Sequence, residues 1–342
     1  MNQLSMHESL PFDEATAPSL VSTGELPDTS QVADVVTEAY ERYSSNGEGA
    51  VADYIPALAS ASPALFGISV VGAKGRFFEI GDVETAFSIQ SVSKPFVLAL
   101  ACDLFGADLT RDRLGANATG MPFNSVMAVE LNEQRTMNPM VNAGAIAATS
   151  LLVEAGGDAE SGWDLVRDGL SRFAGRDLGI DEDVYACETR TNLRNHGIAH
   201  LLHSYDRVQG DPDVATDVYT RQCSLSVDTH DLAVMSATLA DGGVNPITGE
   251  RVVREETCAK VLAVMATAGL YERSGDWLWD IGLPGKSGVS GAIVTVAPGK
   301  GGLATWSPRL DGAGNSVRGQ MITRRLSIDL GLNVFASRAV VD

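Results

Sequence analysis

Two serines and one lysine stand close together in the segment FSIQSVSKPF, residues 87–96. Ser91 precedes Lys94 by three residues, and positions i and i+3 of a helix lie on one face. A serine hydroxyl becomes a nucleophile when a base removes its proton, and a lysine serves as that base when burial lowers its pKa. Ser93 is adjacent to Lys94 in sequence and would point elsewhere on the helix. The spacing therefore favours Ser91 as a nucleophile and Lys94 as its base.

A second motif strengthens this interpretation, because S-x-x-K alone also arises by chance from a capping serine and a solvated lysine. Lys286-Ser287-Gly288 stands before the apolar run GAIVTV. Serine acyl-transfer enzymes of the β-lactamase type combine S-x-x-K with a Lys-Thr/Ser-Gly on a strand beside the site. A phosphate-binding loop would instead need glycine at Asp280 and a helix after the lysine, and the sequence favours a strand there.

Three histidines raise the possibility of a metal site. His196, His200 and His203 are spaced by four and three residues, which would place them on one helical face. There is no H-E-x-x-H motif, and no nearby cysteine or aspartate evidently completes a ligand set. We therefore expect ordinary helix residues and no metal.

The elements that must position these residues begin with a helical pattern over residues 32–43. Two β-rich runs follow, residues 68–72 and 76–80, with a short turn between them that is typical of a hairpin. A helix is expected from Ser91 onward, with Pro95 tolerated in its first turn. The middle of the chain, roughly residues 91–280, is mostly helical in pattern.

The end of the chain returns to strands. GAIVTVAP and GLATWSP flank a Gly-Lys-Gly turn, and a last helix is expected over about 316–330. The simplest arrangement is an α/β (α+β) fold in which both chain ends build one mostly antiparallel sheet and a helical lobe is inserted. We expect a flexible acidic tail over residues 1–30 and a catalytic domain over 31–342. Its sheet lobe would span about 31–90 and 281–342, and its helical lobe about 91–280.

Composition excludes several partners. The chain has 342 residues, with 25 Lys plus Arg against 44 Asp plus Glu and a net charge of −19. Such an acidic surface argues against nucleic acid, which binds through surplus cations. No run approaches the roughly 18–20 apolar residues that span a membrane, and the N-terminus does not resemble a secretory signal. The four cysteines form no C-x-x-C pair, so we expect reduced thiols, a cytoplasmic location and no membrane partner.

Eight stretches of the sequence carry a family resemblance. They are VADYIPALA (51–59), FSIQSVSKPF (87–96), NPMVNAGAI (138–146), CETRTNLRN (187–195), YTRQCS (219–224), DGGVNPITGERV (241–252), GLPGKSGVSG (282–291) and WSPRLDGAGNSV (306–317). In this order they resemble the serine-dependent glutaminases, amidohydrolases that convert L-glutamine to L-glutamate and ammonia. The chain is similar to the short bacterial form, because no ankyrin-like repeat follows. The resemblance implies a β-lactamase/penicillin-binding-protein-like fold, no cofactor and a homo-oligomer, a dimer or tetramer.

The resemblance also implies roles for individual residues. Ser91 would be the nucleophile and Lys94 its base, with the backbone N–H of Val289 in the oxyanion hole. Substrate would be bound by Tyr54, Gln90, Asn142, Asn195, Glu188, Tyr219 and Tyr271, where Glu188 pairs with the ammonium, the two asparagines hold the amino-acid end, and Tyr219 and Tyr271 flank Ser91. A pocket that reads a free amino acid needs such acceptors and donors. Taken singly, each of these residues could equally be a core tyrosine, a cap or a surface charge.

Two alternatives remain open at this stage. A β-lactamase or peptidoglycan carboxypeptidase would share the fold and S-x-x-K, but no S-D-N triplet is present and such enzymes need an export signal. A catalytically silent binding protein on the same fold is the other, and the intact Ser91, Lys94 and tyrosine set argues against it.

Overall fold

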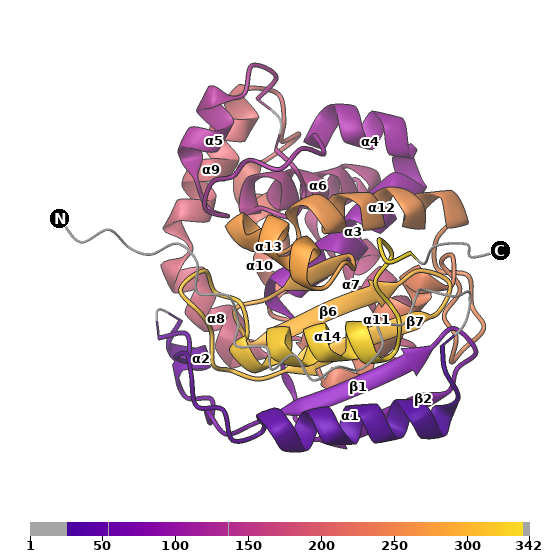
Figure 1. The fold of residues 1–342 in the computed structure, drawn as a ribbon. Helices are drawn as coiled ribbons and strands as arrows, with labels where there is room; N and C mark the ends of the chain where they lie inside the picture. Colours follow the sequence, from indigo (N-terminus) through magenta and orange to yellow (C-terminus); the bar gives the residue numbers. More distant parts are fainter. Residues whose placement is uncertain (1–25, 54, 136, 338–342) are drawn as a thin grey trace.

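The computed structural model describes residues 26–53, 55–135 and 137–337 (Figure 1). The first 25 residues of the expected tail and the predicted site residue Tyr54 lie outside this part of the chain. Across the described ranges, every helix falls short of the length and hydrophobicity that a bilayer-spanning segment needs.

The α-helices are α1 (Thr29–Tyr43), α2 (Pro56–Ala59), α3 (Lys94–Phe105), α4 (Ala107–Leu114), α5 (Val126–Leu131), α6 (Asn142–Gly156), α7 (Ala159–Ala174), α8 (Glu182–Thr191), α9 (Leu193–Ser204), α10 (Pro212–Cys223), α11 (Thr229–Ala240), α12 (Glu255–Ala268), α13 (Ser274–Asp280) and α14 (Val317–Asp329). The 3-10 helices are η1 (Gln90–Ser93) and η2 (Tyr271–Arg273). The strands are β1 (Gly67–Gly72), β2 (Phe77–Gly81), β3 (Phe87–Ser88), β4 (Ser226–Val227), β5 (Gly285–Ser287), β6 (Ala292–Ala297) and β7 (Gly301–Trp306).

The main sheet is built from both ends of the sequence, as predicted. Its strand order is β2-β1-β7-β6-β5, and every neighbouring pair is antiparallel. The N-terminal hairpin joins the C-terminal one where β1 pairs with β7, with Val70 opposite Leu303. A small second sheet pairs β3 with β4, so that Phe87 lies opposite Val227. This pairing ties the segment just ahead of Ser91 to the end of α10.

Helices cover both faces of the main sheet. Ile68 and Val70 point into a cluster with residues of α1 and α14, whereas Val71 belongs to the cluster shared with the helical lobe. Alternate residues of a strand face opposite sides, so β1 is apolar on both. Figure 1 shows α1 and α14 against the sheet in the lower half of the view, with the helical lobe above. The helix α11 packs against β1, β6 and β7 and connects the two parts.

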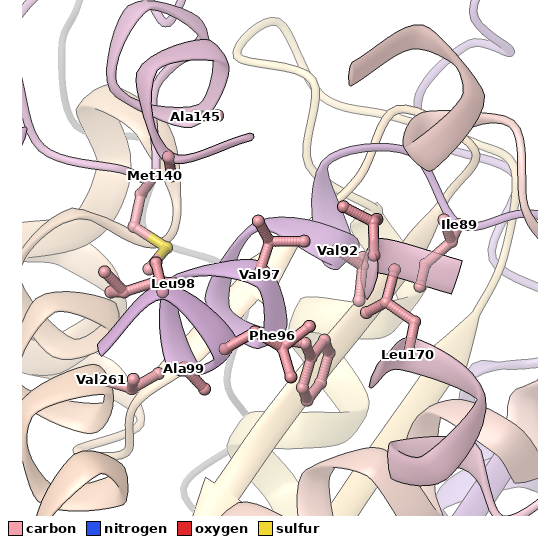
Figure 2. Packing of buried hydrophobic residues seen from close by; sticks show 14 of the residues in the cluster. Ile89, Val92, Phe96, Val97, Leu98, Ala99, Met140, Ala145, Leu170 and Val261 are labelled. Carbon is pink, nitrogen blue, oxygen red and sulfur yellow. The ribbon is translucent and has the colours of Figure 1, made fainter. Parts of the chain in front are cut away.

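The helix α3 runs through the centre of the helical lobe. Residues 94–102 are all buried, which is expected for a helix that is apolar on every side. Figure 2 shows Phe96, Val97 and Leu98 projecting into a cluster that includes Met140 and Leu170. The predicted helix thus forms, but it opens with the 3-10 turn η1 before the α-helix starts at Lys94. As a result, Lys94 begins a helix whose first nine residues are all buried.

A half-buried charge pair links α11 to the sheet. His230 Nδ1 lies 2.6 Å from Glu79 Oε1, and Ser69 Oγ donates to the same oxygen at 2.8 Å. The hydrogen bond that His230 donates to Glu79 raises the pKa of His230 even though burial opposes the rise. Burial alone would raise the pKa of Glu79, but the hydrogen bonds from His230 and Ser69 together lower it. The pair therefore stabilises the fold most where both groups are charged.

Replacing His230 with glutamine should lower the free energy of unfolding in a pH-dependent way. A raised histidine pKa contributes stability below the unfolded value of about 6.5 and loses it as pH rises through the folded value. A lowered carboxylate pKa contributes above its unfolded value and loses it as pH falls. We expect a deficit of about 1 kcal/mol between roughly pH 5 and 6.5 that shrinks as pH rises through the raised pKa of folded His230. Urea unfolding across this range measures it. Glu79→Gln should show the same window, and a pH-independent deficit in both variants would contradict the assignment.

Candidate active site

The turn η1 places Ser91 and Lys94 together. In a 3-10 helix the side chains at i and i+3 eclipse one another, and the backbone N–H of Lys94 donates to the carbonyl of Ser91. The two side chains therefore leave the same side of the turn, as the sequence spacing predicts. Pro95 follows in the first turn of α3, where its missing N–H disturbs no helical hydrogen bond.

Ser93 has a different environment from Ser91. Its hydroxyl donates to the carbonyl of Gln90 at 2.8 Å and accepts from Gln222 Nε2 at 2.9 Å. It is fully buried and is not among the residues that line the neighbouring cleft, whereas Ser91 is. Ser93 thus holds the turn together, and Ser91 is the serine that a small molecule can reach.

The cleft at Ser91 has a volume of about 190 Å³. Pockets that bind drug-sized ligands have volumes of about 300–1,000 Å³, so this cleft suits a smaller molecule. Its described lining residues are Ile55, Gln90, Ser91, Phe123, Asn124, Asn142, Glu188, Thr191, Asn192, Arg194, Asn195, Tyr219, Cys223 and Val289. Seven of the predicted site residues therefore meet at one place: Gln90, Ser91, Asn142, Glu188, Asn195, Tyr219 and Val289.

The side chain of Lys94 is buried behind Asn142. It is only 1 % exposed, and its Nζ lies 2.8 Å from Asn142 Oδ1 and 3.4 Å from the carbonyl of Met140. No carboxylate pairs with it within the described ranges. Burial lowers the pKa of Lys94 to about 8. A large fraction of the side chain is therefore a neutral amine in mildly alkaline solution.

Asn142 connects Lys94 to two further residues of the cleft. Its Oδ1 also accepts from the hydroxyl of Tyr219 at 3.3 Å, and its Nδ2 donates to Asn195 Oδ1 at 3.0 Å. Asn142 begins α6, whose Gly144 packs against the preceding turn so closely that a Cβ there would lie 2.2 Å from the carbonyl of Asn138. The glycine thus allows the turn that carries Met140 and Asn142 to fold against the helix.

A second lysine is buried beside Tyr271. Lys286 Nζ donates to the carbonyls of Gly269 at 2.9 Å and Ser287 at 2.6 Å, and it lies 4.3 Å from the centre of the Tyr271 ring. Burial, with repulsion from Lys94, holds the pKa of Lys286 well below its ordinary value. The Tyr271 hydroxyl donates to the carbonyl of Ser287 at 3.2 Å. Lys286 and Tyr271 thus hold the end of β5 from one side.

Tyr271 itself is not among the described lining residues of the cleft. Its ring packs 5.0 Å from the ring of Phe123, which does line the cleft. Its φ of 57° lies in the left-handed region that a bulky residue rarely adopts. Such strain persists where the surroundings enforce it, often at functional sites. The printed contacts of Tyr271 are thus with Phe123, which lines the cleft, and with the carbonyl of Ser287 at the end of β5.

Gln90 and Glu188 form the polar end of the cleft. Gln90 Nε2 donates to Glu188 Oε1 at 2.6 Å and to Ser88 Oγ at 3.1 Å. Burial raises the pKa of Glu188, and the hydrogen bond from Gln90 partly opposes the rise. Gln90 has a φ of 51°, so the residue just before Ser91 is also held in the left-handed region. Gln90 thereby fixes the orientation of the Glu188 carboxylate toward the cleft.

The segment after β5 brings a backbone donor to the cleft. Gly288 N–H donates to the carbonyl of Ala292 at 2.9 Å and closes the turn into β6. A Cβ on Gly288 would lie 3.1 Å from Val92 Cγ2 and 3.3 Å from the carbonyl of Ile89, so this segment packs tightly against η1. The N–H of Val289 has no acceptor among the described residues. It is a free donor in the wall that also carries Ser91.

Several lining residues were not predicted from the sequence, namely Ile55, Phe123, Asn124, Thr191, Asn192, Arg194 and Cys223. Arg194 and Asn192 lie in the segment CETRTNLRN, from which only Glu188 and Asn195 were singled out. That sequence neighbourhood was an available signal for both. Phe123 and Cys223 carry no such signal, because apolar and thiol side chains are usually core residues.

The three histidines of α9 make ordinary contacts. His196 Nδ1 and His200 Nε2 lie 2.7 and 3.1 Å from the same oxygen of Asp213, and His203 Nδ1 lies 3.0 Å from the carbonyl of Val208. Among the residues that the structure describes, no group of three or more His, Cys, Asp or Glu side chains is arranged to hold a metal ion.

Comparison with known proteins agrees with this site. A family model described as Glutaminase matches residues 49–335. Glutaminase 2 of Yersinia pestis is 56% identical over 317 residues, which cover 93% of each chain. The structure is similar to that of the probable glutaminase ybaS, with a TM-score of 0.89 and 42% identity over 91% of this chain and 100% of that one. It is also similar to Mglu in its glutamate form, with a TM-score of 0.85 and 36% identity over 90% of this chain and 70% of that one.

The solved structures share the β-lactamase-like arrangement of a sheet from both chain ends and an inserted helical lobe. The family model covers most of the chain, including every cleft residue named above. The chain therefore belongs to the glutaminase family, the amidohydrolases that convert L-glutamine to L-glutamate and ammonia.

Proposed function

We propose that this protein hydrolyses the side-chain amide of L-glutamine by double displacement, with Ser91 as nucleophile and Lys94 as its base. The observation that supports this most directly is the burial of Lys94 without a carboxylate partner in the described structure, on the same side of the turn as the reachable serine. A lysine in such surroundings readily loses its proton, and an adjacent hydroxyl is then within reach of a base.

The contacts of Lys94 suit the neutral amine. A neutral amine has two N–H bonds and one lone pair. Asn142 Oδ1 and the carbonyl of Met140 accept two hydrogen bonds from Nζ. The lone pair occupies the remaining position on the nitrogen. The i, i+3 spacing of Ser91 and Lys94 directs it toward the side of the turn that carries Ser91. In this proposal Lys94 accepts the Ser91 proton as the serine oxygen attacks the amide carbon.

The developing oxyanion would be stabilised by two backbone donors. The N–H groups of Ser91 and Val289 would form the oxyanion hole, and such donors typically contribute a few kcal/mol each to the transition state. The C–N bond then breaks, and the departing nitrogen takes the proton held by Lys94, with Tyr271 as a shuttle. Water next attacks the γ-glutamyl ester and gives a proton to Lys94. The ester bond to the Ser91 oxygen then breaks and Lys94 returns the proton to that oxygen, which releases glutamate and regenerates Ser91.

The rest of the cleft would recognise the amino-acid end of the substrate. Glu188, oriented by Gln90, would bind the ammonium, while Asn142, Asn195 and Tyr219 would donate and accept hydrogen bonds around it. Tyr54 is assigned to substrate by the resemblance alone, because it lies outside the described residues. A site that satisfies the polar groups of one substrate discriminates strongly against analogues that leave them unpaired.

We also propose a cytoplasmic homo-oligomer that needs no cofactor. The four cysteines are buried and free, which is compatible with a reducing compartment. Exposed apolar side chains such as Met127 and Leu131 on α5 are compatible with a subunit interface. The oligomeric state rests on the family resemblance.

Replacing Ser91 with alanine should abolish ammonia release from L-glutamine, because no other residue in the described lining places a hydroxyl group on the turn that leads into Lys94. We expect a loss of at least about 10⁴-fold in kcat, as for other serine nucleophiles. A coupled ammonia assay measures it. Ser93→Ala is the matched control: it should cost about 1–2 kcal/mol of stability but keep turnover within about tenfold. Wild-type turnover by Ser91→Ala would end the proposal, and a wild-type protein without turnover would favour the silent binding alternative.

The rate should depend on pH through Lys94. Because the neutral amine is the base, kcat/KM should rise about tenfold per pH unit below about 8 and level off above it. Initial rates between pH 6 and 9.5 measure this limb. His230→Gln serves as control, since the pKa of His230 is shifted as well, upward in this case, but His230 lies in the pair that links α11 to β2. The assignment fails if the limb lies near pH 6.5 and disappears in His230→Gln.

Replacing Lys94 with methionine should raise stability while removing activity. The lowered pKa means that folding disfavours the proton, so the wild type is destabilised below the folded value near 8 and recovers as pH rises toward 10.5. The variant should gain about 3 kcal/mol at pH 7, and the gain should shrink above pH 8. Chemical unfolding at pH 7 and 9.5 measures this difference. A destabilised variant at pH 7 would show that the ammonium is favourably paired instead.

A further inference from the structure

A second pocket shares Val289 with the cleft at Ser91. Its volume is about 210 Å³, and its walls come from α2 and the segment after it, from β3, from the start of α8 and from the segments that follow β5 and β7. Figure 1 shows α2 beside α8, and the two helices are in contact. Among the described lining residues of this second pocket, Val289 alone belongs to the predicted active site. The second pocket is therefore a separate space that adjoins the cleft.

The charge in the second pocket has one sign. Its described lining contains one carboxylate, Asp181, and no lysine, arginine or histidine. Asp181 caps α8, because its Oδ1 accepts from the backbone N–H of Val184 at 3.0 Å. Within the described structure, no hydrogen bond or ion pair uses its other carboxylate oxygen. A wall with one negative charge and no positive charge favours a cation over an anion.

Two buried serines of the lining add acceptor atoms. Ser290 is 6 % exposed, and its buried Oγ has no hydrogen-bond partner among the described residues. Ser88 Oγ accepts from Gln90 Nε2 at 3.1 Å, and a hydroxyl oxygen has two lone pairs, so one remains. A primary ammonium has three N–H donors and no acceptor. The free oxygen of Asp181 and the two serines therefore suit an ammonium group.

The rest of the second pocket suits an apolar body. Leu58, Val184 and Trp306 are buried residues of its lining. The rings of Phe87 and Trp306 are stacked with their centroids 4.5 Å apart, and aromatic rings attract cations as well as apolar groups. A protein cavity of roughly 150 Å³ can hold benzene. The second pocket therefore has room for a benzene-sized body that carries one small polar group.

We propose that the second pocket binds a small organic amine, with the ammonium at Asp181 and the apolar body against Trp306, and that the bound cation assists turnover in the neighbouring cleft. Two residues connect the sites: Val289 lines both, and Ser88 accepts from Gln90, which also binds Glu188. A positive charge beside Val289 would stabilise the oxyanion that develops in the cleft. The binding site goes beyond the proposed function, whereas its effect on turnover rests on that function.

The first test is calorimetric titration at pH 7 with three probes of similar size and shape: benzylamine, which is a cation, benzyl alcohol, which is neutral, and benzoate, which is an anion. Asp181→Asn removes the charge and keeps a good helix cap. Ala61→Leu adds apolar volume in the half-buried lining without changing charge. Glu182→Gln is the matched control, because Glu182 is exposed next to Asp181 and is not among the described lining residues.

Benzylamine should bind the wild type with a Kd between about 0.1 and 1 mM, as expected for so small a ligand. Asp181→Asn should weaken this binding at least about tenfold, because a charged hydrogen bond is lost. Benzyl alcohol should bind both proteins equally and more weakly than benzylamine binds the wild type, and benzoate should not bind. Ala61→Leu should lose both ligands, while Glu182→Gln should match the wild type.

The second test measures ammonia release from L-glutamine with and without benzylamine. The amine should raise kcat about two- to fivefold in the wild type and in Glu182→Gln. It should have no effect in Asp181→Asn or Ala61→Leu, whose turnover without the amine should match the wild type. An acceleration that persists in both variants would show that benzylamine attacks the γ-glutamyl ester instead, and it would overturn the effect of the second pocket on turnover.

Three titration results would overturn the binding site. The first is no binding of benzylamine by the wild type up to roughly 10 mM, which would leave the pocket to water. The second is equal affinity for benzylamine and benzyl alcohol, which would show that the charge is not recognised. The third is unchanged affinity in both Asp181→Asn and Ala61→Leu, which would place the amine elsewhere. A wild type without turnover would end the proposed function and the effect on turnover, but the titrations would still decide the binding site.

Discussion

The burial of Lys94 among uncharged acceptors is the constraint around which the site is organised. Its Nζ contacts an amide oxygen and a carbonyl, Asn142 Oδ1 and the carbonyl of Met140. A carboxylate in either place would hold the proton and raise the pKa, as charge pairs do elsewhere. Lowering the pKa from 10.5 to about 8 disfavours the ammonium by about 3 kcal/mol. This cost lowers the stability of the folded protein, and the lowered pKa gives a base that works near neutral pH.

The surrounding architecture explains how such a site can exist. The helix α3 is apolar on all sides and lies inside the helical lobe, so its first residue is drawn into the core with it. The turn η1 ahead of it is held by the Ser93–Gln222 bond and by the pairing of β3 with β4. The segment after β5 packs against the same turn through Gly288. Nucleophile, base and free backbone donor therefore come from one rigid junction between sheet and helices.

Much of this framework could be predicted from the sequence because its signals are local. The two hairpins follow from alternating β-rich runs around glycine turns, and the i, i+3 spacing of Ser91 and Lys94 survives the change from an α-helical to a 3-10 turn. The positive φ angles of Gln90 and Tyr271 carry no local signal, since neither residue type favours them. Tertiary packing imposes them, and they depend on contacts with Glu188 and β5 that the sequence does not reveal.

The acceptors of the two buried lysines show the same limit. Lys286 and Lys94 both donate to backbone carbonyls, and a carbonyl looks alike at every position of a sequence. Arg194 was missed for a different reason, because an exposed arginine at a helix start is usually a solvated charge. Only the fold shows that it lines the same cleft as Glu188. Sequence motifs thus predicted the reacting groups. The groups that shift their pKa values or select the substrate could be identified only from the fold.

Charge is distributed differently at the depth of the cleft and at its surface, and this separation fits the chemistry. Deep in the site, neither Lys94 nor Lys286 pairs with a carboxylate among the described residues, and burial is the largest cause of the lowered pKa of each. The lining of the cleft includes one acidic and one basic side chain, Glu188 and Arg194. Beyond both, the chain carries a net charge of −19. Glutamine is neutral overall and is little affected by that field, whereas glutamate carries one net negative charge and is repelled. Salt screens this long-range repulsion but leaves the pKa values of the buried lysines almost unchanged. The acidic surface can therefore weaken the rebinding of glutamate without disturbing the base.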